Sequence, residues 1–130
     1  DGKQTRSFTY IKDVAPYIAN AAFDKEAYNH VFNLGADEPF TVNQIAEHVV
    51  KAMGKDNHEI IHHEARNEVM HTSPTHEKAK NHLKHETSHN LQQGIEKMAS
   101  WVKENGARET PEFTEIEIEK NLPPAWKKSN

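Results

Sequence analysis

Residues 2–14, with the sequence GKQTRSFTYIKDV, carry three structural signals in succession. A glycine-led polar turn contains Arg6, the alternating residues 8–11 predict a short strand, and Asp13 is typical of a helix N-cap. Pro16 agrees with a helix that begins here, because proline is tolerated in the first helical turn. These signals place Arg6 just ahead of a strand, where its position is well fixed. A guanidinium in such a place suits a two-point partner, so we expect either a structural salt bridge or a ligand phosphate.

Helical periodicity appears in three longer segments. Apolar residues at a spacing of three and four predict an amphipathic helix over residues 14–23, with a seam of small residues that we expect to be buried. Thr41 and Gln44 form a capping-box pattern, which predicts a helix that Gly54 is placed to end. A last helix is expected over residues 91–104.

The remaining signals are shorter. Residues 30–34 and 59–63 have apolar centres and polar flanks, which predict two short strands. The Ser-Pro-Thr sequence at residues 73–75 offers a cap for a short helix that ends near Leu83. Residues 111–130 combine an alternating run with two successive prolines, so we expect an extended tail there.

Composition narrows the class of protein. A chain of 130 residues fits one domain with a moderate core. A formal charge of −4 argues against a nucleic-acid surface, and no apolar run approaches the about 20 residues of a membrane span. The absence of cysteine excludes disulfides and thiol catalysis and favours a reducing compartment, so we expect a cytoplasmic protein. Because the sequence starts with Asp1 and a strand signal follows at once, we also expect a piece of a longer protein.

Ten histidines are a high count for this length, and they fall partly into two groups. One group flanks the segment 59–63, and the other has the three- and four-residue spacing with which a helix can share a metal. Two interpretations are open, a metal site or solvated surface. Residues 86–88 interrupt helix-forming sequence and no HExxH pattern is present, so we expect solvated surface and no metal site. The members are His58, His62 and His63 in the first group and His82, His85 and His89 in the second.

Residues 1–14 resemble the segment that opens the substrate-binding part of the extended short-chain dehydrogenases/reductases, the NAD-dependent sugar-nucleotide epimerases and dehydratases. Four later segments continue the resemblance, which is strongest to the UDP-glucose 4-epimerase group. The resemblance implies an α/β fold class: the C-terminal portion of a Rossmann-type enzyme, made of helices with a few short strands, with residues 1–130 as one sugar-nucleotide-binding domain. The four segments are VFNLGADEPFTVNQIAEHV (31–49), EARNEV (64–69), LQQGIEKMASWVKENG (91–106) and IEIEKNLPPAW (116–126).

The resemblance also implies substrate-binding residues. Arg6 and Arg66 match positions where an arginine meets the nucleotide diphosphate, and Glu68 matches an acidic residue near the ribose. Asn33 lies in a turn that the family places near the substrate cleft. From the residues alone, Asn33 is either a hydrogen-bonded turn asparagine or a ligand contact, and Arg66 is either a surface group or a ligand contact.

The family's chemistry lies elsewhere. These enzymes bind NAD through a glycine fingerprint and react through a Tyr-x-x-x-Lys pair, and the printed sequence has neither. We therefore expect no catalytic residue in this chain and no NAD binding by it, with NAD held by a Rossmann portion outside it. The resemblance implies a homodimer as the complete enzyme. A stand-alone or split-enzyme binding module without catalysis, and a related dehydratase or decarboxylase, are the alternatives.

Overall fold

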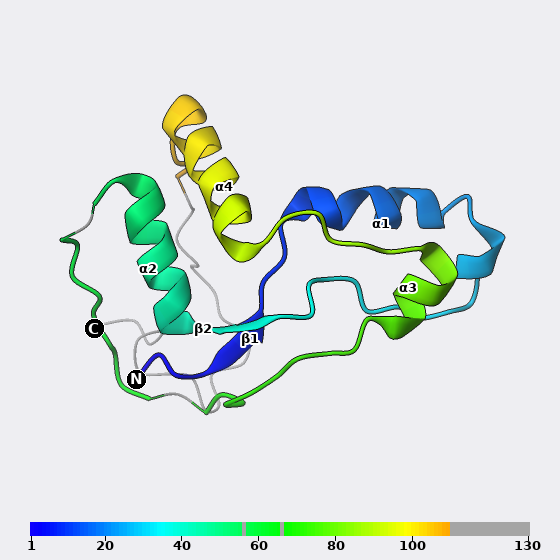
Figure 1. The fold of residues 1–130 in the computed structure, drawn as a ribbon, viewed down its shortest axis with the longest axis horizontal. Coiled ribbons are helices and arrows are strands. Elements are labelled where there is room, and N and C mark those ends of the chain that lie inside the picture. Colours follow the sequence, from blue (N-terminus) through cyan, green and yellow to red (C-terminus); the bar gives the residue numbers. More distant parts are fainter. Residues whose placement is uncertain (56, 66, 110–130) are drawn as a thin grey trace.

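The computed structural model describes residues 1–55, 57–65 and 67–109. Figure 1 shows a small two-stranded sheet in the middle of the molecule, with helices α2 and α4 at one end and α1 and α3 at the other. In chain order the elements are β1 (Thr5–Ser7), the 3-10 turn η1 (Ile11–Asp13), α1 (Ala15–Ala21), the 3-10 turn η2 (Lys25–Ala27), β2 (Pro39–Thr41), α2 (Val42–Met53), α3 (Glu77–Leu83) and α4 (Leu91–Asn105).

The first strand lies earlier than its alternating sequence predicts. β1 pairs antiparallel with β2, and Arg6 lies opposite Phe40. On its other edge Thr5 forms a parallel bridge with His71, and the Thr5 amide donates to the Met70 carbonyl at 2.9 Å. The prediction of a strand over residues 8–11 is therefore wrong, because among the described residues only Thr5 to Ser7 have a partner strand. Arg6 sits inside the strand rather than ahead of it.

The α2–α4 end follows its local sequence signals. Thr41 and Gln44 form the predicted capping box, and Gly54 ends α2 at a φ of 71°. Asn90 and Gln93 form a second capping box at the start of α4, which the sequence analysis did not identify. The two helices pack on each other, and the Lys103 ammonium donates to the Ala52 carbonyl at 2.8 Å.

At the α1–α3 end the predicted helix forms, but its seam is not buried. α1 begins at Ala15 with a proline in its first turn, as expected, and no side chain caps it. Val14, Tyr17 and Ala21 are half-buried, whereas Ala22 is exposed and Ile18 is 59% exposed. The expectation of a fully buried seam is wrong, since within the described residues little packs over this face.

Two predicted strands are absent from the described residues. Residues 30–34 and 59–63 are extended but belong to no sheet, and Val31 is 83% exposed. An extended segment becomes a strand only where another backbone offers hydrogen-bond partners. α3 begins at Glu77, and the side chain of its N-cap residue His76 makes no cap hydrogen bond. From the predicted cap at residues 73–75, the Thr75 hydroxyl accepts a long hydrogen bond from the Glu77 amide at 3.4 Å.

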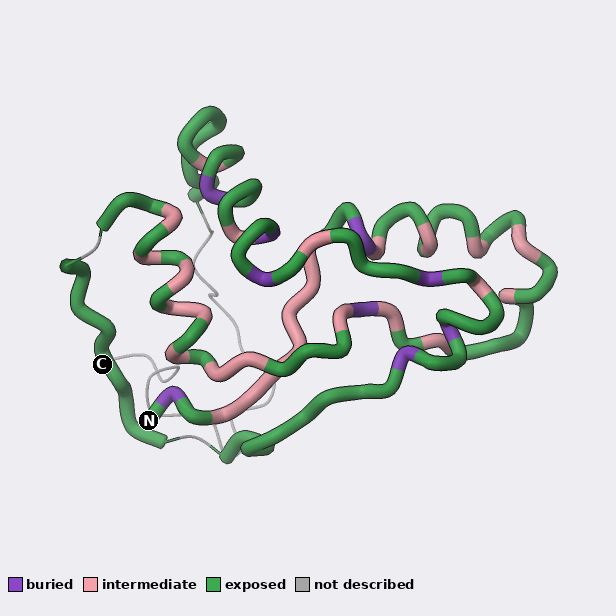
Figure 2. Tube along the Cα trace, viewed as in Figure 1, coloured by how far each residue is buried: buried purple, intermediate pink, exposed green. Residues whose placement is uncertain are grey.

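The buried residues are few and unusually polar. Figure 2 shows them scattered along the trace rather than gathered in one layer. Among the described residues, the buried apolar side chains are Ala79, Leu91 and Ala99, and the buried polar ones are Asp13, His76 and His85. None of the helices in the described ranges is long and apolar enough to cross a membrane. The predicted tail at residues 111–130 lies outside the described residues.

Candidate functional site

Arg6 is held by the backbone of its own strand and of the neighbouring residue Met70. Its Nη1 donates to the carbonyl of Thr5 at 2.7 Å and more weakly to the carbonyl of Met70 at 3.4 Å. The side chain is 28% exposed. Two bonds to main-chain oxygens fix the direction of the guanidinium, so the group is ordered before any ligand arrives.

The structure brings two of the predicted site residues together. Arg6 Nη2 lies 3.9 Å from Glu68 Oε2, and the Glu68 side chain is 34% exposed. This is the structural salt bridge that the sequence left open as one role of Arg6. An ion pair of this length and exposure contributes little to stability, so an anionic ligand can replace the carboxylate at small cost.

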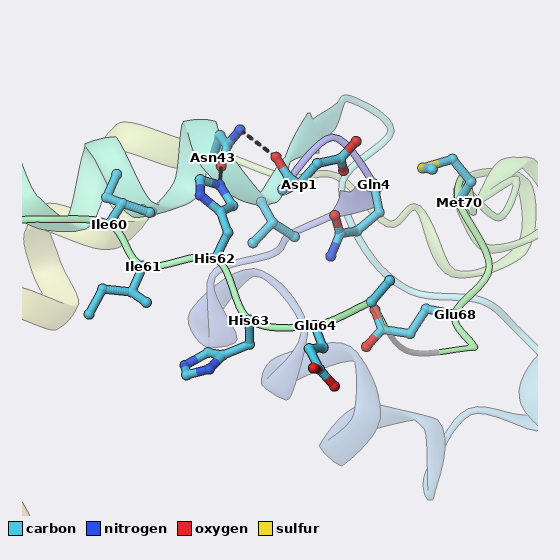
Figure 3. Close-up of a pocket in the computed structure, with 14 residues that line it drawn as sticks. Asp1, Gln4, Asn43, Ile60, Ile61, His62, His63, Glu64, Glu68 and Met70 are labelled. Carbon is cyan, nitrogen blue, oxygen red and sulfur yellow. Dashed lines mark hydrogen bonds between the residues drawn. The ribbon is translucent and has the colours of Figure 1, made fainter. Parts of the chain in front are cut away.

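A cavity of about 570 Å³ adjoins Glu68. Figure 3 shows that residues 60–65 and Glu68 form one side of it, while the N-terminal residues and the start of α2 form the other. Arg6 does not line this cavity, whereas its ion-pair partner Glu68 does. The lining residues used below are Gly2, Gln4, Asn43, His62, Glu64 and Glu68.

One side of the cavity is fixed by Asn43. Its amide Nδ2 donates to the Asp1 carbonyl at 3.1 Å, and its Oδ1 lies 2.8 Å from His62 Nε2 (Figure 3). Gly2 is required opposite it, because a Cβ at this position would lie 1.9 Å from Asn43 Oδ1 and the φ of +71° is left-handed. Sequence reasoning missed Asn43 and His62, since their partners lie 19 to 42 residues away.

Asn33 contacts the segment of residues 70–75 at its far end from Arg6. Its Nδ2 donates to the carbonyl of Thr75 at 3.3 Å, which fits the interpretation of a hydrogen-bonded turn asparagine. Between the two places, Ser7 Oγ lies 3.2 Å from Ser73 Oγ. Residues 70–75 therefore run alongside β1 from Arg6 towards Asn33. The structure brings Arg6 and Glu68 together and holds Asn33 by a separate contact.

Arg66 lies outside the described residues. Its expected convergence with Arg6 on one diphosphate therefore stays a prediction. Its neighbours Ala65 and Glu68 both line the cavity, so the chain on either side of Arg66 passes along this hollow.

A second polar cluster joins η1 to the start of α4. Asp13 does not cap α1 as predicted; its carboxylate accepts from Ser88 Oγ at 2.8 Å and from the His89 amide at 3.0 Å, and His89 Nδ1 lies 2.8 Å away. Burial by itself raises the pKa of Asp13. The hydrogen bonds from His89 and Ser88 together lower the pKa by more than burial raises it, so the pKa of Asp13 lies below the ordinary value. In a catalytic triad, serine and aspartate contact opposite nitrogens of the histidine ring. Here Ser88 and Asp13 both contact Nδ1 of His89, so the arrangement is structural and not a catalytic triad.

The third cluster surrounds the buried histidines. Asp37 pairs with Lys80 and, at 2.8 Å, with Nδ1 of the buried His76. The hydrogen bonds from Lys80 and then from His76 lower the pKa of Asp37. The expectation that His85 and His89 belong to a solvated surface is wrong: His85 is 1% exposed and the His89 side chain 22% exposed. Within the described ranges no group of three or more ligating side chains could hold a metal ion.

Several known proteins are similar to this chain, and three of them are sugar-nucleotide 4-epimerases. A UDP-glucuronate 4-epimerase from Thermodesulfobacterium geofontis is 32% identical over 106 residues, which cover 81% of this chain and 32% of that protein. A UDP-glucuronic acid 4-epimerase mutant from Bacillus cereus, in complex with UDP-4-deoxy-4-fluoro-glucuronic acid and NAD, matches with a TM-score of 0.68 and 28% identity, over 80% of this chain and 33% of that one. A UDP-glucose 4-epimerase with UDP-glucose from Thermotoga maritima matches with a TM-score of 0.68 and 24% identity, over 80% of this chain and 33% of that one.

These similarities confirm the α/β fold class and the resemblance predicted from the sequence. The chain spans about a third of the length of these relatives, which is consistent with a C-terminal part. No protein-family model matches it.

Proposed function

We propose, from the resemblance of this chain to the extended short-chain dehydrogenases/reductases that act as sugar-nucleotide epimerases, that it is the UDP-sugar-binding portion of an NAD-dependent UDP-hexose 4-epimerase. In such an enzyme NAD, bound by a Rossmann portion outside this chain, removes a hydride from C4 of the sugar and returns it to the opposite face. The residues of this chain hold the nucleotide, so that the sugar meets the cofactor in the right orientation. The complete enzyme is proposed to be a homodimer in the cytoplasm.

The observation that carries the proposal is the Arg6–Glu68 pair beside an open cavity. A preordered guanidinium suits the oxygens of a diphosphate, and a carboxylate accepts hydrogen bonds from the hydroxyls of a ribose. When the nucleotide binds, the diphosphate replaces Glu68 as the partner of Arg6, and Glu68 turns to the ribose. Arg66 supplies the second guanidinium, and Asn33 is a more distant contact of the same ligand.

The reacting groups are assigned to the other portion of the enzyme. Tyr10, Tyr17 and Tyr28 are the tyrosines of this chain, and none is followed by lysine four positions later. A nucleotide-sugar dehydratase or decarboxylase must bind the diphosphate in the same way, and so must a binding module without catalysis. These alternatives differ in product: an epimerase yields the C4 epimer, a dehydratase a 4-keto-6-deoxy sugar, and a binding module no product.

The decisive measurement is the affinity for UDP in the protein that carries both portions. Arg6→Lys or Arg66→Lys keeps the charge but loses the planar fork, and we expect each to weaken UDP binding by about 1–3 kcal/mol, the scale of a hydrogen bond to a charged group. NAD binding should not change. Arg108→Lys is the matched control, because Arg108 is exposed and far from the Arg6 segment in sequence.

Isothermal titration with UDP and, separately, with NAD distinguishes the outcomes. A lysine variant at position 6 that binds UDP like the wild type contradicts the assignment of Arg6. A loss of NAD affinity in the same variant indicates misfolding of the site instead. The 130-residue chain alone should neither bind NAD with micromolar affinity nor turn over a UDP-sugar.

A further inference from the structure

The extended segment of residues 30–34 has one contacted edge and one open edge. In an extended chain, successive residues direct their N–H and C=O groups to opposite edges, so residues 31 and 33 share one edge and residues 32 and 34 the other. On the first edge, Lys78 of α3 donates to the Val31 carbonyl at 3.0 Å. Among the described residues, no hydrogen bond reaches the main-chain amide or carbonyl of Phe32 or Leu34. We call the main-chain groups of these two residues the open edge, because they are available to another strand.

Contacts with α3 hold the segment in place. The Phe32 ring lies 5.9 Å from the His82 ring, and the Lys78 ammonium lies 4.8 Å from the centre of the Phe32 ring. The Asn33 amide donates to the Thr75 carbonyl at 3.3 Å. These contacts keep the backbone extended without a sheet, so the open edge is ordered before a partner arrives.

The path of the chain indicates which kind of strand fits the open edge. In Figure 1 the chain leaves α1, turns through η2 and runs back towards β2, so residues 30–34 run opposite to α1. A helix followed by a strand in the opposite direction is the second half of a βαβ unit, which joins parallel strands of one sheet. Residues 31–34 are apolar at three of four positions, as is typical of parallel strands. The segment therefore fits beside a parallel strand.

The strand before α1 is not available as that neighbour. β2 pairs with one edge of β1, and the bridge between Thr5 and His71 occupies the other. Large apolar side chains also stand exposed at this end of the molecule: Ile18 is 59% exposed, Phe23 88% and Val31 83%. Exposed apolar side chains gathered at one end mark a contact surface. Both observations call for a sheet from outside the described chain.

We propose that the open edge pairs with a parallel edge strand of the Rossmann portion of the enzyme. The inference rests on the proposed function, which places that portion outside this chain. The chain spans about a third of the length of the relatives it matches. A Rossmann portion contains an open, mostly parallel sheet, and an open sheet has edges that a further strand can extend. The pairing adds residues 31–34 to that sheet and brings α1 to its face.

A second copy of this chain fits the open edge less well. Two identical edges related by a twofold axis pair antiparallel, whereas the segment fits a parallel neighbour. Residues 31–34 are also short, and an isolated two-stranded pair is only marginally stable in water. A portion of the same protein is present at a high effective concentration, so a short strand is enough to join it.

Hydrogen exchange of single amides, measured by mass spectrometry with electron-transfer fragmentation and without UDP or NAD, tests the pairing. In the 130-residue chain we expect the Phe32 and Leu34 amides to exchange like those of an unstructured chain. In the protein that carries both portions they should exchange about 100-fold more slowly or less. The Val31 and Asn33 amides lie on the other edge and are the internal control, which should stay fast in both proteins.

Proline variants of the protein that carries both portions distinguish the two edges. Leu34→Pro removes an amide from the open edge, and Leu34→Ala is its control for the lost side chain. We expect the protection of the Phe32 amide to be about tenfold lower in Leu34→Pro than in Leu34→Ala, the effect of one lost hydrogen bond. Val31→Pro removes an amide from the edge that faces α3, and it should leave the protection of Phe32 unchanged.

Three results would overturn the proposal. The Phe32 and Leu34 amides could exchange as fast in the protein with both portions as in the 130-residue chain. Their protection could appear in the 130-residue chain and rise with its concentration, which would assign the edge to a second copy. Slow exchange could also be confined to Val31 and Asn33, on the opposite edge.

Titration with UDP separates this proposal from the proposed function. Fast Phe32 and Leu34 amides in a protein that binds UDP, and loses affinity in Arg6→Lys, contradict the strand pairing alone. Slow amides in a protein whose Arg6→Lys variant binds UDP like the wild type contradict the UDP site alone.

Discussion

At the α2–α4 end, both helices begin with a complete capping box and pack on each other; at the α1–α3 end, the side chains of Asp13, His76 and His85 are buried. Figure 2 shows that α4 carries buried residues, whereas α1 and α2 have none. At the first end, the starts of both helices satisfy their hydrogen bonds within a few residues. The second depends on contacts between residues that are distant in sequence. Hydrogen bonds between residues close in sequence can form without the rest of the fold. Hydrogen bonds between residues distant in sequence form only when both segments are in place.

The largest expected effect comes from the residue that connects the two ends. Asp13→Ala leaves Ser88 Oγ, the His89 amide and His89 Nδ1 without their shared acceptor in a buried place. We expect a loss of about 2–3 kcal/mol in the free energy of unfolding, measured by urea denaturation at neutral pH. Glu47→Ala, an exposed carboxylate on α2, should change stability by less than about 0.5 kcal/mol.

The same residue gives a pH dependence of known sign. The pKa of Asp13 is lowered from 3.8, so the folded state binds its proton less readily than the unfolded state. Its contribution to stability is therefore complete above the ordinary pKa and is lost as the pH falls through the folded value. Wild type and Asp13→Ala should converge only in this acid range, well below the histidine range. Convergence already near pH 6 would contradict the assignment to Asp13.

The contrast between the ends also explains how far the sequence could be interpreted. The Thr41–Gln44 capping box and Gly54 were predictable because each signal and its partner lie within one helical turn. Asp13 looked like a cap because the same local pattern fits, but Ser88 and His89 compete for its carboxylate from 75 and 76 residues away. Periodicity cannot identify partners at that distance. Likewise residues 30–34 have a strand-like sequence, yet a strand requires a neighbouring backbone that the described chain does not provide.

The candidate site also contains some residues that the sequence indicated and others that only the structure revealed. Family resemblance pointed to Arg6 and Glu68, and nothing in their spacing showed that they form an ion pair. The Asn43–His62 contact beside the cavity had no sequence signal, because an asparagine in a helix and a histidine in a polar segment are both ordinary surface residues. Their roles follow from the close approach of Gly2 to α2, which only the three-dimensional arrangement reveals.

A moderate effect is expected from the two capping boxes. Thr41→Ala and Asn90→Ala each remove a side-chain acceptor from the first turn of a helix, and each should cost about 1 kcal/mol. Because these interactions are local, hydrogen-exchange protection of residues 77–86 at neutral pH should stay unchanged. Ser100→Ala, which removes only a hydroxyl bonded within α4, is the control. A loss of protection at the α1–α3 end in Thr41→Ala would mean that the ends are not independent.

The smallest effect expected is a gain in stability at the C-terminus of α3. Lys84 has a φ of 53°, in the left-handed region that a residue with a Cβ enters only at a cost. Lys84→Gly removes that cost while keeping the Lys84 carbonyl that accepts from Tyr17, although glycine also makes the unfolded chain more flexible. We expect a net stabilisation of about 0.5–1 kcal/mol, read as a higher urea midpoint at unchanged slope. Asn29 has nearly the same φ, 59°, but asparagine tolerates this region, so Asn29→Gly should gain little. Equal gains in both variants would show that backbone strain at Lys84 is not the cause, and that glycine acts at both positions for another reason.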